Sequence, residues 1–133
     1  MRIEFNRLPI SEEYGQSLFD IYYVTEEGRS EMMELFISLP QNVKDLVKDL
    51  ISRMATVKNF KSPKIKYNLK SYNFGEIRPL PHRFFFFQKC GSNYVFFDYI
   101  LKKKDSVDDK IYKKIDEKKH LYEEEFEKYK STS

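Results

Sequence analysis

The sequence predicts an α+β domain in which helices pack against a small, mostly antiparallel, twisted sheet. The order of hydrophobic patterns along the chain is strand, two helices, three strands and a final helix. The helical segments repeat apolar residues every three or four positions, whereas residues 84–87 (FFFF) and 94–101 form the apolar runs of strands covered on both faces. A chain of 133 residues is long enough for one core. We therefore expect a single α+β domain over residues 1–133.

The N-terminal quarter predicts one weak and one strong strand. Residues 2–8 alternate weakly before Pro9, which indicates a short strand or an ordered arm. Residues 18–25 (LFDIYYVT) are rich in β-branched and aromatic side chains and predict a strand. Residues 1–15 are thus expected to add an N-terminal arm or an edge strand to the domain.

Two amphipathic helices are expected next, joined by the segment LPQN. Ser30 is suited to cap the first helix, whose apolar residues follow the spacing i, i+3, i+4 and i+7. Pro40 ends this helix, and Asn42 is expected to cap a second helix that keeps its apolar stripe to Met54. The pattern predicts a helical hairpin whose apolar stripes cover a sheet or each other.

The C-terminal half predicts most of the sheet. After a basic loop, three strands are expected at about residues 72–80, 82–89 and 93–101, followed by a helix over about 108–129. Ser106 and Asp109 have the spacing of a capping box at the start of that helix. All helices are expected on one face of the sheet.

Positive charge is concentrated in one third of the chain. Residues 61–104 carry ten Lys or Arg and two acidic residues, a net charge of 10 − 2 = +8, whereas the remainder carries 14 − 19 = −5. The same stretch holds most of the expected strand aromatics. Cations beside aromatic faces suit a ligand with many phosphates and with bases that stack. This stretch therefore predicts RNA binding.

The composition argues against several classes of protein. Cys90 is the only cysteine, which excludes an internal disulfide and fits a reducing cytosol. No signal peptide is visible, and no apolar run approaches the roughly 20 residues of a membrane span. Two histidines without a paired His or Cys spacing disfavour a metal site. We expect a cytoplasmic protein with no metal, no cofactor and no membrane partner.

Three motifs follow one another in a set order. They are FISLPQNVKDLVKDLI in the helices, EIRPLPHRFFFF entering the sheet and LKKK leaving it. In this order they resemble toxins of the RelE/ParE superfamily, and among these the phage-derived, HigB-like branch. The segment 76–78 (EIR) takes the place of the family's ELR motif, 82–83 (HR) that of its YR motif, and 102–103 (KK) that of its paired lysines. The resemblance covers roughly residues 18–130.

The resemblance implies a type II toxin–antitoxin system. Such toxins cleave mRNA on the ribosome, and a helix-turn-helix antitoxin silences them. The implied reaction is metal-free attack of the RNA 2′-OH on the adjacent phosphate. The catalytic candidates by resemblance are Arg83, Arg78, Lys102, Lys103 and His82. The residues expected to bind RNA are Lys104, Lys66, Lys70 and Lys89.

The candidate residues also suit purely structural roles, and the sequence differs from the family pattern at some positions. Arg83 also suits a solvated strand position or an ion pair with Glu76. Arg78 suits an ion pair with Glu76 or Asp98 that orders the sheet, and His82 suits a loop edge. Asp98, which stands where the family carries a histidine, is expected to pair with a sheet arginine. Two other functions therefore stay open, a ParE-like inhibitor of gyrase and a non-catalytic, phage-derived nucleic-acid-binding protein.

Overall fold

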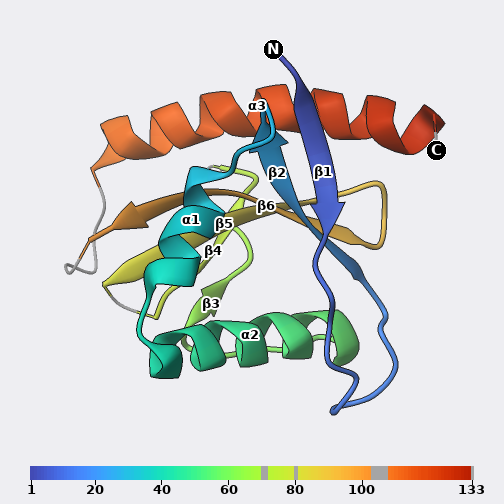
Figure 1. The fold of residues 1–133 in the computed structure, drawn as a ribbon, viewed down its shortest axis with the longest axis vertical. Helices are drawn as coiled ribbons and strands as arrows, with labels where there is room; N and C mark the ends of the chain where they lie inside the picture. The colour runs from blue at the N-terminus through green and yellow to red at the C-terminus, as the bar shows by residue number, and fades with distance from the viewer. Residues whose placement is uncertain (70–71, 80, 103–107, 133) are drawn as a thin grey trace.

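The computed structural model describes residues 1–69, 72–79, 81–102 and 108–132. Within these residues the chain forms one six-stranded sheet, in the order β1-β2-β6-β5-β4-β3, and three helices (Figure 1). The elements in chain order are β1 (Ile3–Arg7), β2 (Asp20–Glu26), α1 (Glu31–Ser38), α2 (Gln41–Thr56), β3 (Ile65–Lys66), β4 (Gly75–Ile77), β5 (His82–Lys89), β6 (Asn93–Leu101) and α3 (Asp109–Thr132). The β2–β6 pair is parallel and the other four neighbouring pairs are antiparallel. The expected α+β class and mostly antiparallel sheet are confirmed.

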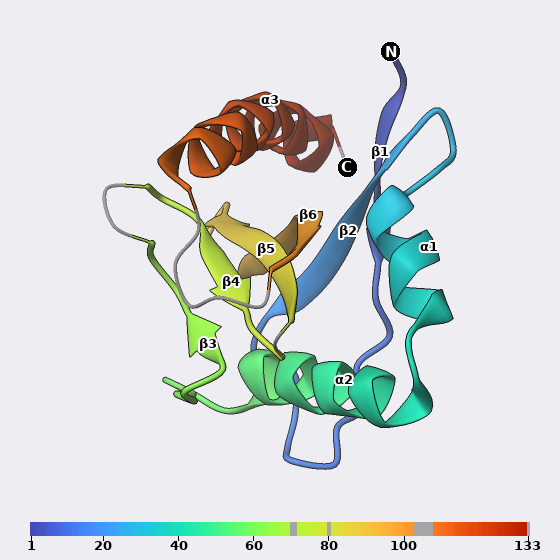
Figure 2. The ribbon, with the colours of Figure 1, turned by 90° about the vertical axis from the view of Figure 1, so that its left-hand side faces the viewer.

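The helices cover both faces of the sheet. α1 and α2 lie on one face and α3 lies on the other (Figures 1 and 2). The β5 strand accounts for this, because Phe84 and Phe86 pack with α1 and α2 whereas Phe85 and Phe87 pack with α3. None of the four rings is more than 3% exposed. The expectation that all helices share one face is wrong, because a strand of consecutive phenylalanines needs apolar cover on both sides.

The starts of the first two helices differ in chemistry. Ser30 caps α1 as expected, and its Oγ accepts a hydrogen bond of 3.1 Å from the backbone N–H of Met33. Asn42 is not the cap of α2. The cap residue is Pro40, which contributes no side-chain hydrogen bond but has its φ held at −55° by the ring.

The segment between α1 and α2 is extended. Leu39 and Pro40 have ψ values of 155° and 148°, which turn the chain sharply between the helices. The two helices run in different directions in both ribbon views, rather than side by side (Figures 1 and 2). Their apolar stripes cover the sheet instead of each other.

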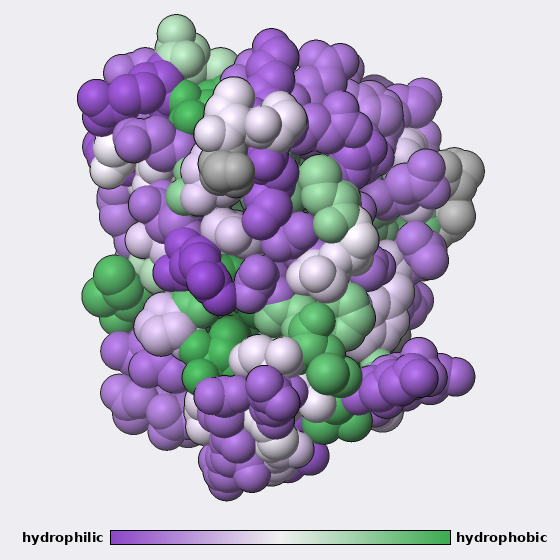
Figure 3. Space-filling view, turned by 90° about the vertical axis from the view of Figure 1, so that its right-hand side faces the viewer, coloured by the Kyte–Doolittle hydropathy of each residue, from purple (hydrophilic) through white to green (hydrophobic). Residues whose placement is uncertain are grey.

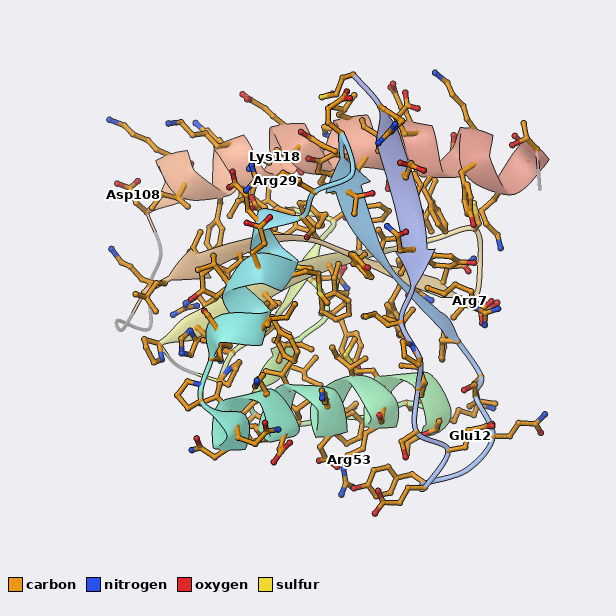
Figure 4. The ribbon with its side chains drawn as sticks, viewed as in Figure 1. Arg7, Glu12, Arg29, Arg53, Asp108 and Lys118 are labelled. Atoms are coloured by element: carbon orange, nitrogen blue, oxygen red, sulfur yellow. The ribbon has the colours of Figure 1, made fainter. Side chains whose placement is uncertain are left out.

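The N-terminal segment adds an edge strand and a loop fastened to α2. β1 pairs with β2, and the ring of Phe5 packs against Phe126 of α3 with centroids 5.0 Å apart. In the following loop, the Tyr14 hydroxyl is hydrogen-bonded to Asp49 of α2, and the Arg53 guanidinium lies 4.0 Å from the Tyr14 ring centroid. Figure 4 shows Arg53 beside this loop. In Figure 3, apolar side chains gather in the lower half of the face that includes the loop.

The strand expected at residues 72–80 is shorter, because β4 spans only Gly75–Ile77. Gly75 lies where β4 passes close to the backbone of residues 66–67 and to the Phe86 ring. A Cβ at this position would lie 2.4 Å from the carbonyl oxygen of Lys66 and 2.6 Å from the Phe86 ring. Pro79 follows β4 and has no N–H to continue the ladder. Leu80, the expected end of this strand, lies outside the described residues.

The C-terminal helix has the apolar stripe that the sequence predicts. Tyr112, Ile115, Tyr122 and Phe126 are buried against the sheet. Asp108 accepts a hydrogen bond of 3.0 Å from the backbone N–H of Lys110 at the helix start. The capping box expected between Ser106 and Asp109 is not tested, because Ser106 lies outside the described residues. No helix in the described part of the chain combines the length and the apolar character needed to cross a membrane.

Replacing Phe126 by Ala tests the packing of α3. The ring is fully buried among Phe5, Tyr22 and Phe87, so its loss is expected to lower the free energy of unfolding by about 3–5 kcal/mol. Leu121→Ala on the same helix is the control, because Leu121 is 39% exposed and should change the free energy by less than about 0.5 kcal/mol. Urea denaturation measures both values. Equal effects of the two substitutions would contradict the packing described.

Candidate nucleic-acid interface

Three strand ends meet at one end of the sheet. β4 ends, β5 begins and β6 ends there, because these neighbours are antiparallel. His82 lies opposite Leu101, and the backbone N–H of Lys102 donates a hydrogen bond of 2.7 Å to the carbonyl oxygen of Pro81. Arg78, directly after β4, donates its backbone N–H to the carbonyl oxygen of Lys64 at 2.6 Å. The fold thus gathers cations from distant parts of the sequence.

We call this surface the basic end of the sheet. It consists of Lys64, Lys66, Arg78, His82 and Lys102. Lys64 and Lys66 are exposed and Lys102 is half-buried. Within the described residues, none of these three lysines has an acidic side chain at ion-pair distance. Their positive charge is therefore available to an anionic ligand.

Arg78 is held in place at the rim of the basic end. Its side chain is 18% exposed, and its Nε lies 3.6 Å from Oε1 of Glu76. The same carboxylate oxygen lies 3.0 Å from Nη1 of Arg83. Glu76 therefore bridges two arginines, one of which reaches the surface.

Arg83 is fully buried beneath α3, on the face of the sheet opposite to His82. Its ion pair with Glu76 matches the structural interpretation left open by the sequence. Burial raises the pKa of Glu76, and the positive charges of Arg83 and Arg78 oppose this rise. In this arrangement Arg83 links β5 to β4, and Glu76 connects it to Arg78 at the surface.

His82 forms a polar pair with a tyrosine that sequence reasoning missed. Its Nδ1 lies 2.8 Å from the hydroxyl oxygen of Tyr99. Burial lowers the pKa of His82 and raises that of Tyr99, so it favours the uncharged form of both side chains. Nε2 makes no hydrogen bond to the described residues, which leaves it available for proton exchange. The strand register brings the two side chains together, and it depends on a β-bulge that the sequence pattern does not reveal.

A hollow of about 330 Å³ lies beside Arg78. Lys64 and Arg78 line one side, and Asn42 and Val43 at the start of α2 line another. The first turn of α2 has no acidic residue and no side-chain cap. Its N–H groups and the two cations together favour an anion in this hollow.

Lys89 lies away from the basic end. It is at the opposite end of β5 from His82, about 23 Å along the strand at roughly 3.3 Å per residue. Its Nζ lies 2.8 Å from Oε1 of Glu127 and 3.9 Å from Oε2 of Glu123 on α3. The structure therefore does not bring Lys89 together with the other RNA-binding candidates. Lys70, Lys103 and Lys104, also expected at the site, lie outside the described residues.

Asp98 pairs with a helix lysine rather than with the expected sheet arginine. Its Oδ2 lies 3.4 Å from Nζ of Lys118 on α3, and its Oδ1 accepts a hydrogen bond of 2.9 Å from the backbone N–H of Tyr99. Figure 4 shows Lys118 near the start of α1, where Arg29 also lies. The sequence could not identify this partner, because it depends on α3 covering that face of the sheet.

The pKa of His82 can be measured by NMR titration of its ring. We expect a midpoint below 6.5, because burial disfavours the charged imidazolium. Between that midpoint and 6.5 the unfolded chain binds more protons, so His82 adds stability as the pH rises through this window. His82→Asn assigns the signal, since the chain has only two histidines. A midpoint at or above 6.5 would contradict the effect of burial on the His82 pKa described above.

Comparison with known proteins leaves the site to be interpreted from its own geometry. No protein-family model matches the chain, and no curated protein matches it.

Proposed function

We propose that the basic end of the sheet binds RNA and cleaves it, and that the protein is the toxin of a type II toxin–antitoxin system. The observation that carries this proposal is that Arg78, Lys102 and His82 lie at one end of the sheet, where a hollow lined by Lys64 and Arg78 suits an anion. Phosphate groups are the anions that RNA offers at regular spacing. The ordered EIR, HR and KK motifs support the toxin assignment by their resemblance to the RelE/ParE superfamily.

In the proposed complex, the hollow beside Arg78 receives one phosphate. Lys64 and Arg78 supply positive charge, and the N–H groups that open α2 supply hydrogen-bond donors. Lys66 on β3 and Lys102 after β6 would contact neighbouring phosphates. Binding of this kind weakens steeply as salt concentration rises, because phosphate contacts release counterions.

The proposed reaction is attack of a ribose 2′-OH on the adjacent phosphorus. His82 accepts the 2′ proton at Nε2, the 2′-oxygen–phosphorus bond forms and the bond from phosphorus to the 5′-oxygen breaks. Arg78 and Lys102 stabilise the negative charge of the pentavalent phosphorane, and a proton from Lys102 or from water neutralises the leaving 5′-oxygen. The products are a 2′,3′-cyclic phosphate and a 5′-hydroxyl.

The proposed partners are mRNA on the ribosome and a helix-turn-helix antitoxin. The reaction requires RNA, and the resemblance implies both the ribosome-bound mRNA and the antitoxin. The exposed apolar side chains of Leu35 and Ile37 on α1 support a protein contact on that side of the molecule.

One observation favours a second candidate function, RNA binding without cleavage. Arg83, the residue that matches the family's arginine, is buried in an ion pair with Glu76. A site that lacks this arginine at its surface keeps the charge needed to bind RNA but has one fewer cation for the phosphorane.

Expression in growing bacteria separates these candidates. Inducing the wild-type protein should arrest growth and produce new mRNA 5′ ends in primer extension on translated messages. Combining Arg78→Ala with Lys102→Ala should relieve the arrest and reduce cleavage by about 100-fold, because it removes two phosphate-binding charges. Lys128→Ala is the matched control, since Lys128 is exposed near the C-terminal end of α3.

The outcomes are distinct. RNA binding in a filter assay without new 5′ ends would support the second candidate and overturn cleavage. Full toxicity of the folded double variant would show that the basic end is not the site. Growth arrest accompanied by broken chromosomal DNA and intact mRNA would instead favour gyrase as the target.

A further inference from the structure

A second cavity lies between α1, α2 and residues 8–11 of the N-terminal segment. Its volume is about 420 Å³, which is within the range of small-molecule sites. Met33 and Phe36 of α1 and Ile51 of α2 form its walls, and Phe84 and Phe96 of the sheet are its deepest residues. We call it the α1–α2 cavity. Arg78, His82 and Lys102 of the basic end do not line it.

The cavity reaches down to the sheet. Phe84 and Phe96 are almost completely buried, so a ligand that touches them must pass the side chains of α1, α2 and residues 8–11. Methionine side chains are flexible and adapt to the shape of an apolar ligand. These features suit a slender apolar chain better than a flat protein surface.

Two polar side chains of α2 interrupt the apolar lining. Ser52 is only 7% exposed, and within the described residues its hydroxyl makes no hydrogen bond. Lys48 is exposed at the rim and has no acidic side chain at ion-pair distance in the described part of the chain. The two residues are four positions apart and therefore lie on the same side of α2.

The neighbouring acids are engaged elsewhere. Asp49 pairs with Arg53 at 3.0 Å and accepts a hydrogen bond from Tyr14. Asp45 accepts a hydrogen bond of 2.7 Å from the side chain of Gln41. The charge of Lys48 and the Ser52 hydroxyl are thus left to meet a ligand that combines an anionic head with an apolar body.

We propose that the α1–α2 cavity binds a free monocarboxylate with a medium-length acyl chain. The acyl chain enters between the helices toward Phe84 and Phe96. The carboxylate accepts a hydrogen bond from the Ser52 hydroxyl and forms an ion pair with Lys48. This site is separate from the proposed RNA site and does not depend on that function.

Calorimetric titration of the full chain with decanoate and with decan-1-ol tests the proposal. Both share the apolar chain, but only decanoate carries the charge. Lys48→Gln is expected to weaken decanoate binding about tenfold and to leave decan-1-ol binding unchanged, as the loss of one charged hydrogen-bonding partner implies. Lys44→Gln is the matched control, because Lys44 is on the same helix but does not line the cavity.

A second variant tests the apolar part of the site. Ser52→Leu fills the cavity and is expected to abolish binding of both ligands, with circular dichroism to check that the chain is folded. Should this variant not fold, the comparison of Lys48→Gln with Lys44→Gln still decides the matter. The proposal is overturned if decanoate does not bind the wild-type protein, if Lys48→Gln leaves its affinity unchanged or weakens both ligands equally, or if folded Ser52→Leu still binds decanoate.

Discussion

The fold depends on the need to bury four consecutive phenylalanines in one strand. Side chains alternate along β5, so Phe84 and Phe86 enter one core and Phe85 and Phe87 enter the other. Each aromatic ring buries a large apolar area, and neither face of the strand can be left to water. α1 and α2 cover one face, and the long α3 covers the other (Figure 2). A sheet enclosed in this way leaves its strand ends as the places where charge can face water, whereas a charge within the strands needs a partner, as in the pair of Glu76 and Arg83.

The basic end follows from that enclosure. Arg78 and Lys102 come directly after strands, and His82 opens one, so their side chains reach the surface at positions set by the sheet. Arg83 lies one residue further into β5 and is buried with Glu76 as its counter-charge. Because Glu76 also contacts Arg78, the buried ion pair is linked to the surface cation that we propose binds phosphate.

The local sequence pattern predicts the helices and strands better than it predicts how they are arranged in space. The spacing of apolar residues located the helices, and Ser30 was identified as a cap, because both depend on neighbours within one turn. The prediction that α3 covers the same face as α1 and α2 is wrong, although the FFFF run already requires cover on both faces of the sheet. Alternation along β5 places Arg83 on the same face as Phe85, so its burial could have been inferred. The ion-pair partners of Lys89 and Asp98 could not have been inferred from the sequence. These partners lie on α3, so the pairs depend on how α3 packs against the sheet.

The central claim is that RNA binds at the basic end, and NMR shift mapping with a short single-stranded RNA tests it most directly. The account predicts that the amide and side-chain signals of Lys64, Arg78, His82 and Lys102 move on titration. The signals of Lys89 and of the C-terminal turns of α3 should not move. Lys89 lies at the other end of β5, and the glutamates of α3 that pair with it would repel RNA. Shifts centred on Lys89, or no shifts at the basic end at low salt, would contradict it.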